Sequence, residues 1–346
     1  GRLYELDNAI KSGHIPPRIA TNLGFGYGYP LFNFYPPFIY YLAEIFHIIN
    51  FSFVNSLKIT IFLSILLSGL GMYLFVKNLF QDKWAAFVAS IFYIYAPYRA
   101  VDIYIRGAFS ESFAFVFIPY IFWSYLNLSI KKNTFHVVIA SLFLFLLMIT
   151  HNLSFLITFL ILPFYFIYLI YNSKQRKQLS IHISTSVIIA FCLSAFFWMP
   201  SLLEKKYTLV DSVFLATKYT DHFLSPSQIW NSAWGFGGST LGLEDGISFK
   251  LGKLHIITSV LALIFGLFIH SKIRKNIPIN YQLNTIFLVF ILLIFSLFMT
   301  TVYSNFLWNI FTPLTYVQFP WRFLLLSTFF SSVLAGSLIF LIKIKP

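Results

Sequence analysis

Long uncharged runs of apolar residues constrain the fold of this chain more than any other feature. Residues 59–76, 137–149 and 283–299 are examples, and none of them includes a charged side chain. A membrane-spanning helix needs roughly 20 mostly apolar residues, and in hydrocarbon a helix satisfies its own backbone hydrogen bonds. The runs lack the alternating pattern of a lipid-facing β-barrel. Only 10% of the residues are charged, against roughly a quarter in soluble domains. The sequence therefore predicts an all-α polytopic membrane protein.

The apolar runs predict about nine spanning helices within a single transmembrane domain over residues 1–346. Residues 1–54 form a predicted first outer loop that begins with a polar amphipathic helix, and residues 200–253 form a large outer loop. Because the chain does not begin with Met, we expect it to be a fragment that a further span precedes. Cys192, the single cysteine, is expected to be a small core residue, and it excludes an intramolecular disulfide. The predicted spans are 55–76, 84–98, 112–130, 134–150, 153–172, 181–199, 254–271, 281–301 and 322–342.

The distribution of charge predicts the orientation in the membrane. Alternate short loops hold twelve basic residues and a single acid, Asp82, whereas the other ten acids lie in the longer loops. Short basic loops are typical of the cytoplasmic side. We therefore expect a multi-pass protein of the cytoplasmic membrane, with the start of the chain outside and its end inside. The basic residues fall in short clusters between apolar runs, and this distribution also argues against a nucleic-acid partner. The twelve are Lys77, Lys83, Lys131, Lys132, Lys174, Arg176, Lys177, Lys272, Arg274, Lys275, Lys343 and Lys345.

Function is expected on the elaborated outer side, which residues 1–54, 99–111, 200–253 and 302–321 form. The first of these segments contains a run, 24–37, of alternating glycines, aromatic residues and prolines. Tyr27, Tyr29 and Tyr35 belong to it. Such a stiff aromatic surface suits the apolar face of a sugar, and it equally suits anchoring at the membrane interface. Residues 38–49, too short to span comfortably, predict a helix near the membrane surface.

Two other outer segments carry arginine at the membrane edge. Asp102 and Arg106 are four residues apart, so a helical turn would place them on one face. This pattern predicts either a structural ion pair or a site for phosphate, whose oxygens the planar guanidinium holds well. Arg322 follows Trp321, and it indicates either an interfacial anchor or an anionic ligand such as a lipid phosphate. We expect Tyr98, Gln318 and Trp321 to face substrate beside the two arginines.

Other polar residues give less specific signals. His151 could carry a proton, although Asn152 beside it could simply cap the next helix. Glu244 and Asp245, the only adjacent pair of acids, could hold a divalent metal ion. No HExxH, CxxC, Walker A or Rossmann pattern occurs in the chain.

Several motifs together resemble one bacterial and archaeal family, the 6-pyruvoyl-tetrahydropterin synthase-related membrane proteins. The resemblance covers nearly the whole chain. Pterin synthases of that name are small soluble proteins with a zinc site of histidines, and no such trio is visible in this sequence. The architecture is instead similar to that of the GT-C glycosyltransferases of the cell envelope. The motifs are residues 26–30, 29–33, 34–37, 96–98, 106–108, 245–252 and 318–322.

The resemblance implies an enzyme that takes a sugar from a polyprenyl-phosphate carrier, a membrane lipid, on the outer face. It also implies an Asp and a His just upstream of the position that matches Gly1. Within this chain the candidates for an acid or base are Glu5, Asp7, Asp102 and Glu111, and those for binding phosphate are Arg106 and Arg322. The alternatives are a non-enzymatic role in the export or assembly of envelope polysaccharide and a pterin-related enzyme.

Overall fold

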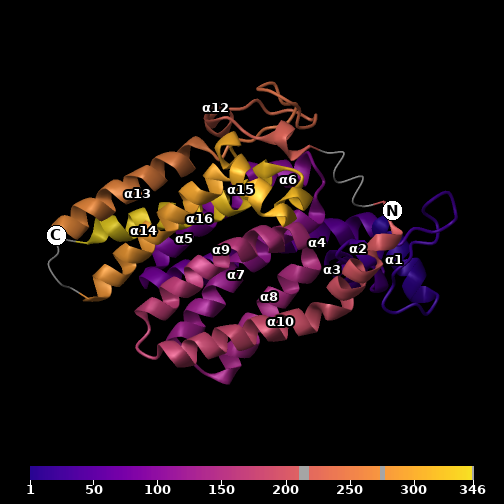
Figure 1. Ribbon diagram of the computed structural model, residues 1–346, viewed down its shortest axis with the longest axis horizontal. Helices are drawn as coiled ribbons and strands as arrows, with labels where there is room; N and C mark the ends of the chain where they lie inside the picture. The colour runs from indigo at the N-terminus through magenta and orange to yellow at the C-terminus, as the bar shows by residue number, and fades with distance from the viewer. Residues whose placement is uncertain (210–217, 273–276, 345–346) are drawn as a thin grey trace. The chain divides into compact units, whose positions relative to one another are not determined.

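The computed structural model describes residues 1–209, 218–272 and 277–344, without the side chains of 277–279. Within these ranges the chain is helical, with two isolated β-bridges and no strand (Figure 1). An all-α polytopic membrane protein is confirmed. Three of the basic residues used for the orientation, Arg274, Lys275 and Lys345, lie outside the described residues.

Seven helices are long and apolar enough to cross a membrane among the described residues. All nine predicted segments are helical, but two of them are shorter apolar helices: α5 has 12 residues and α8 has 17. At 1.5 Å per residue, α5 covers only about 18 Å of the roughly 30 Å hydrocarbon core. The prediction that this helix extends to residue 98 is wrong. The backbone of Ala96 is extended, and Pro97 begins a separate helix, α6. The seven are α4 (Phe53–Phe80), α7 (Phe109–Lys131), α9 (Asn152–Asn172), α10 (Arg176–Glu204), α13 (Lys253–Lys272), α14 (Ile277–Phe298) and α16 (Leu324–Lys343).

The remaining helices are short. The polar helix and the surface helix predicted near the start of the chain are both present, as α1 and α3. The short α-helices are α1 (Arg2–Lys11), α2 (Leu31–Phe34), α3 (Phe38–Ile48), α5 (Lys83–Ile94), α6 (Pro97–Tyr104), α8 (Thr134–Thr150), α12 (Pro226–Trp230) and α15 (Asn305–Ile310). The 3₁₀ helices are η1 (Lys205–Tyr207), η2 (Tyr219–His222), η3 (Val302–Ser304), η4 (Thr312–Val317) and η5 (Pro320–Phe323).

The chain divides into two compact units, and α4 and α7 contribute residues to both. Unit 1 comprises residues 1–67, 109–117 and 124–210. In it α10 packs against α8 and α9, and α3 packs against α1 and α8 (Figure 1). Cys192 on α10 is exposed, so the expectation of a core position is wrong. The reason is that lipid accepts a small apolar side chain as readily as a protein core does.

Unit 2 comprises residues 68–108, 118–123 and 211–346, and α16 is its central helix. Helix α16 lies alongside α5, α13 and α14 (Figure 1). Small residues allow the closest of these approaches, since a Cβ at Gly336 would lie 2.5 Å from the carbonyl oxygen of Ala85 and 2.8 Å from Cβ of Ala89. At one end of this packing Lys343 pairs with Asp82, which also caps α5 through the amides of Trp84 and Ala85.

Candidate functional site

A strained turn precedes the last spanning helix in unit 2. Gln318 has φ 63° and ψ −40°, and the amide of Phe319 donates to the carbonyl of Val317 at 2.7 Å. These values define a γ-turn with positive φ, a rare and strained form. A non-glycine residue in such a conformation costs roughly 1–3 kcal/mol, and strain of this kind gathers at functional sites.

The strained turn positions an arginine and two aromatic rings. The Val317 carbonyl also accepts a hydrogen bond from Nη1 of Arg322 at 2.7 Å, which fixes the position of the guanidinium. Arg322 lies over the ring of Phe319, 5.2 Å from its centroid, and 5.9 Å from that of Trp321. The rings of Phe319 and Trp321 stack with centroids 5.0 Å apart. Trp321 is buried, whereas Phe319 and Arg322 are partly exposed.

A second arginine reaches the same indole from the turn that follows α6. The guanidinium of Arg106 lies 4.5 Å from the centroid of the Trp321 ring. It forms an ion pair with the fully buried Asp102, four residues earlier, and it also donates to the hydroxyl of Tyr98 at 3.5 Å. Arg106, which belongs to the predicted Asp102–Arg106 pair, and Arg322 therefore both contact one aromatic residue, Trp321. Tyr98 is buried with its ring edge-on to Trp321, so it faces this cluster from within the protein.

The indole nitrogen of Trp321 is buried and finds no hydrogen-bond acceptor among the described residues. A buried N–H left unpaired costs about 1–3 kcal/mol, so a native structure that retains one calls for an explanation. Two guanidinium groups and this N–H on one aromatic pair form a set of donors suited to the oxygens of an anion. The described residues thus give the predicted arginines a common setting: a candidate anion-binding site around Trp321.

A histidine that the sequence analysis did not single out lies next to this site. The ring of His222, on η2, contacts Phe319 edge-to-face with centroids 4.7 Å apart. Its Nδ1 lies 2.9 Å from Oγ of Ser239, and Ser239 in turn hydrogen-bonds the carboxylate of Asp245. Burial lowers the pKa of His222, while Asp221 and Asp245 act in the opposite direction. No local motif marks this residue, because its partners are distant in the sequence.

Asp245 organises the large loop of unit 2. Its carboxylate accepts hydrogen bonds from the amide of Thr240 at 2.8 Å and from Nε2 of Gln228 at 2.5 Å, besides that from Ser239. Burial raises the pKa of Asp245, and these donors oppose the rise. Its neighbour Glu244 is exposed. Among the described residues, no three His, Cys, Asp or Glu side chains stand close enough together to hold a metal ion.

A separate group of carboxyls is buried in unit 1. Glu5 accepts a hydrogen bond from the amide of Asn22 at 3.1 Å, which ties α1 to the following loop. Asp7 forms an ion pair with Lys11 at 2.8 Å and lies 4.0 Å from Nε2 of His47. Both acids are 3% exposed, so these two candidates for an acid or base lie inside the fold.

Glu44 on α3 completes this group as a second residue that the sequence analysis missed. It is also 3% exposed, and its Oε2 has no hydrogen-bond partner among the described residues. Burial first, and the adjacent Asp7 second, raise the pKa of its carboxyl. His47 and Lys11 act in the opposite direction.

The aromatic run of the first segment forms a projecting loop. Backbone hydrogen bonds between Ala20 and Tyr29 close it, and Gly24, Gly26 and Gly28 inside it all have positive φ. Tyr27 at its tip is 95% exposed and Tyr29 is 51% exposed. Tyr35 instead lies beneath the guanidinium of Arg2, 4.1 Å from its ring centroid, so it belongs to the packing of α1. The loop thus holds two of the three tyrosines that are candidates for facing substrate.

Two further candidates have local roles. His151, rather than Asn152, is the N-cap of α9, because its extended backbone lets Nδ1 accept the amide of Ser154 at 3.2 Å. Glu111 is buried in the first turn of α7, where a carboxylate favours the positive end of the helix dipole. Both residues lie in unit 1.

A family model described as "6-pyruvoyl-tetrahydropterin synthase related domain; membrane protein" matches residues 32–342. The chain belongs to this family. A search of curated proteins finds no significant match. The predicted resemblance to these pterin synthase-related membrane proteins is confirmed.

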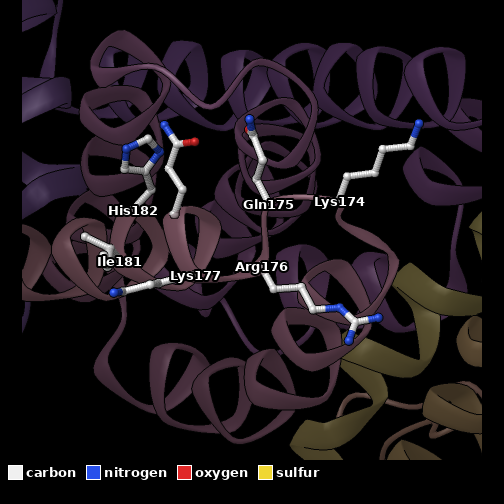
Figure 2. Close-up of a pocket in the computed structure, with 7 residues that line it drawn as sticks. Lys174, Gln175, Arg176, Lys177, Ile181 and His182 are labelled. Carbon is white, nitrogen blue, oxygen red and sulfur yellow. The ribbon is translucent and has the colours of Figure 1, made fainter.

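In this pterin synthase-related protein, a hollow of about 600 Å³ lies far along the sequence from the Trp321 site, at the turn between α9 and α10. Lys174, Arg176, Lys177 and His182 line it, yet their side chains fan out from the turn rather than converge (Figure 2). Charges that diverge into solvent do not form a ligand site. The turn is one of the short basic loops that predict the cytoplasmic side.

Proposed function

We propose that the protein is a GT-C-like glycosyltransferase that transfers a sugar from a polyprenyl-phosphate donor at the outer face of the cytoplasmic membrane. The observation that carries this proposal is the convergence of Arg106, Arg322 and the unpaired N–H of Trp321. In glycosyl transfer the lipid phosphate leaves as an anion. Donors fixed in advance where that charge develops lower the barrier.

The aromatic surroundings support a glycosyl phosphate in particular. Phe319 is partly exposed and lies under Arg322. An aromatic face suits the apolar face of a sugar ring. A phosphate held by Arg322 would therefore leave its sugar beside the exposed part of Phe319. The site lies at the start of α16, one of the seven candidate spans, so it would lie near the level of the lipid headgroups, where a lipid phosphate is found.

The proposed orientation rests on charge and on one contact. Lys343 and Asp82 belong to two loops that are predicted to be cytoplasmic, and they form an ion pair within unit 2. Arg322 and Lys343 lie near opposite ends of the span Pro320–Lys343. A cytoplasmic Lys343 would therefore put Arg322 and the anion site outside.

The test uses full-length protein in lipid nanodiscs and radiolabelled polyprenyl-phosphate sugars. Wild type should bind the lipid phosphate and transfer sugar to an extracted lipid or glycan acceptor. Arg322→Gln should weaken lipid-phosphate binding about tenfold or more, the expected loss of a hydrogen bond to a charged group. Arg322→Lys keeps the charge but loses the planar fork, so it should recover only part of the affinity.

Arg176→Gln is the matched control, since this exposed arginine lies at the α9–α10 turn, and it should leave binding unchanged. A wild-type protein that neither binds lipid phosphate nor transfers sugar would contradict the proposal. Retained envelope assembly in cells that carry the Arg322→Gln variant would instead favour the non-enzymatic role.

A further inference from the structure

His222 and Arg322 both lie against the ring of Phe319. The imidazole and the phenyl ring are T-shaped, with an interplanar angle of 68°. Both side chains are within 5.2 Å of the Phe319 centroid, measured from the imidazole centroid and from the guanidinium carbon. A glycosyl phosphate beside Phe319 would therefore have a cation next to its phosphate and an imidazole nearby for the incoming group.

The proposed protonation of His222 rests on its hydrogen-bond partner. Nδ1 lies 2.9 Å from Oγ of Ser239, and either atom can be the donor. Ser239 also lowers the pKa of the Asp245 carboxyl through a side-chain hydrogen bond. A hydroxyl whose one proton goes to a carboxylate accepts from a neighbouring N–H. This arrangement favours the tautomer with the proton on Nδ1 and a lone pair on Nε2, which is the state that a base requires.

The loop holds this relay in place. Asp245 is fixed by Gln228 and by the amide of Thr240, so its carboxylate cannot turn away from Ser239 without breaking both bonds. Gly237 and Gly246 pair their backbones, with the amide of Gly237 donating to the Gly246 carbonyl at 2.7 Å. A Cβ on Gly237 would lie 2.9 Å from Cα of Gly246. This close approach requires glycine and keeps the two sides of the loop together.

We propose that His222 is the general base of the transfer, with Ser239 and Asp245 as positioning residues that hold its ring in the tautomer with an unprotonated Nε2. This inference rests on the proposed glycosyl transfer. The acceptor hydroxyl oxygen forms a bond to the anomeric carbon, and the bond from that carbon to the phosphate oxygen breaks. The hydroxyl proton passes to Nε2 of His222. The bonding electron pair leaves with the lipid phosphate, whose charge Arg106 and Arg322 stabilise.

The charges around His222 agree with this role. Burial lowers its pKa, so the ring stays neutral and able to accept a proton at neutral pH. Asp221 and Asp245 oppose that shift and would stabilise the imidazolium that forms during the step. General-base catalysis of this kind contributes about 100-fold or more to a rate.

The first experiment measures the tautomer directly. Full-length protein labelled with ¹⁵N-histidine in nanodiscs is examined by NMR, and His222→Gln identifies the resonances of His222. At neutral pH, Nδ1 should be protonated and Nε2 unprotonated. Ser239→Ala should shift the ring toward a mixture of tautomers, whereas Ser239→Thr should retain the wild-type state. An unprotonated Nδ1 in wild type would overturn the inference.

The second experiment separates catalysis from binding. His222→Gln should lower kcat about 100-fold and abolish the acid limb of the pH profile, while its Kd for polyprenyl phosphate stays within about twofold of wild type. Ser239→Ala should lower kcat less and leave the pH profile bell-shaped. An unchanged kcat in His222→Gln would overturn the base role of His222 but not the proposed function. A loss of lipid-phosphate affinity as large as the loss of kcat would do the same. Absence of transfer by wild type would overturn the proposed function and the base role with it.

Discussion

Arg106 and Arg322 lie against one indole, that of Trp321, at 4.5 and 5.9 Å from the ring centroid. The first arginine lies two residues after the end of α6, and the second lies in η5 at the start of the α16 span, so the fold of unit 2 joins two distant segments at a single aromatic residue. Cations over an indole face gain roughly 0.5–2 kcal/mol each from the ring quadrupole. That gain adds to the ion pair of Arg106 with Asp102 and to the hydrogen bond of Arg322 with the Val317 carbonyl.

The first prediction concerns the unpaired N–H of Trp321. Trp321→Phe keeps an aromatic ring for the arginines but removes the N–H. We expect the affinity for polyprenyl phosphate to fall about tenfold, because a hydrogen bond to a charged oxygen contributes roughly 1.5–3 kcal/mol. We expect thermal stability in detergent to change little, since the variant also loses a buried donor that had no acceptor among the described residues.

Trp308→Phe is the control for that substitution. Trp308 is also buried, but its Nε1 donates to Oγ of Ser304 at 3.2 Å. Its loss should therefore lower stability without changing lipid-phosphate binding. Equal affinity of wild type and Trp321→Phe would show that the indole N–H is not a ligand of the phosphate.

The second prediction concerns the strained γ-turn at Gln318. Gln318→Gly should be neutral or slightly stabilising, because glycine adopts positive φ without steric cost. Gln318→Val should lower stability by about 1 kcal/mol or more, since a β-branched residue is least tolerant of this conformation. The relevant measurement is the melting temperature of each purified variant in one detergent. A glycine variant as unstable as the valine variant would show that the Gln318 side chain, rather than the backbone, is what matters.

The apolar helices could be predicted because each span needs a long uninterrupted run, and that requirement is visible in the sequence alone. The boundary of α5 was missed because it depends on the backbone of Ala96 before Pro97, a single residue whose extended conformation ends the helix. The exposure of Cys192 was missed for a related reason. Hydropathy does not distinguish a side chain that faces lipid from one that faces another helix.

The candidate site was only partly predictable. Arg106 and Asp102 share a helical turn, so their spacing revealed the pair. His222 lies in a polar loop without a motif, and its role depends on Phe319 and Asp245, which only folding brings near. Glu44 lies within an apolar run, and its partner Asp7 belongs to another helix, α1. Contacts of that kind come from tertiary packing and leave no local pattern.

The third prediction concerns pH. The Glu44 carboxyl has a raised pKa, first because of burial and then because of Asp7. The folded state therefore holds this proton more tightly than the unfolded state does. The stability that this tighter proton binding gives is fully present below the unfolded pKa, near 4.5. It is lost as the pH rises through the folded pKa of Glu44. Glu44→Gln cannot ionise, so it should match wild type at pH 4 and melt at a higher temperature than wild type at pH 8.

Glu244→Gln provides the control for this pH series, since Glu244 is exposed. Its melting temperature should follow that of wild type at every pH. A Glu44→Gln variant that is less stable than wild type at pH 8 would show that ionised Glu44 is held by favourable contacts, contrary to the raised pKa.

The last prediction concerns orientation, and single-cysteine labelling tests it. Cys192 is exposed on α10, so every variant is made in a Cys192→Ala background. Tyr27→Cys lies at the tip of the projecting loop and should react with a membrane-impermeant maleimide in intact cells. Lys343→Cys should react only after the membrane is permeabilised, because the predicted cytoplasmic side holds the short basic loops.

Asp82→Cys tests the same side through a second loop. Lys343 and Asp82 form an ion pair in unit 2, so the two cysteine variants must give the same accessibility if this unit is folded as described. Labelling of all three positions from outside would contradict the charge rule for this protein. Labelling of Lys343→Cys and Asp82→Cys, but not of Tyr27→Cys, in intact cells would invert the orientation. It would then move the Trp321 site to the cytoplasmic face, and with it the side from which the sugar donor has to be supplied.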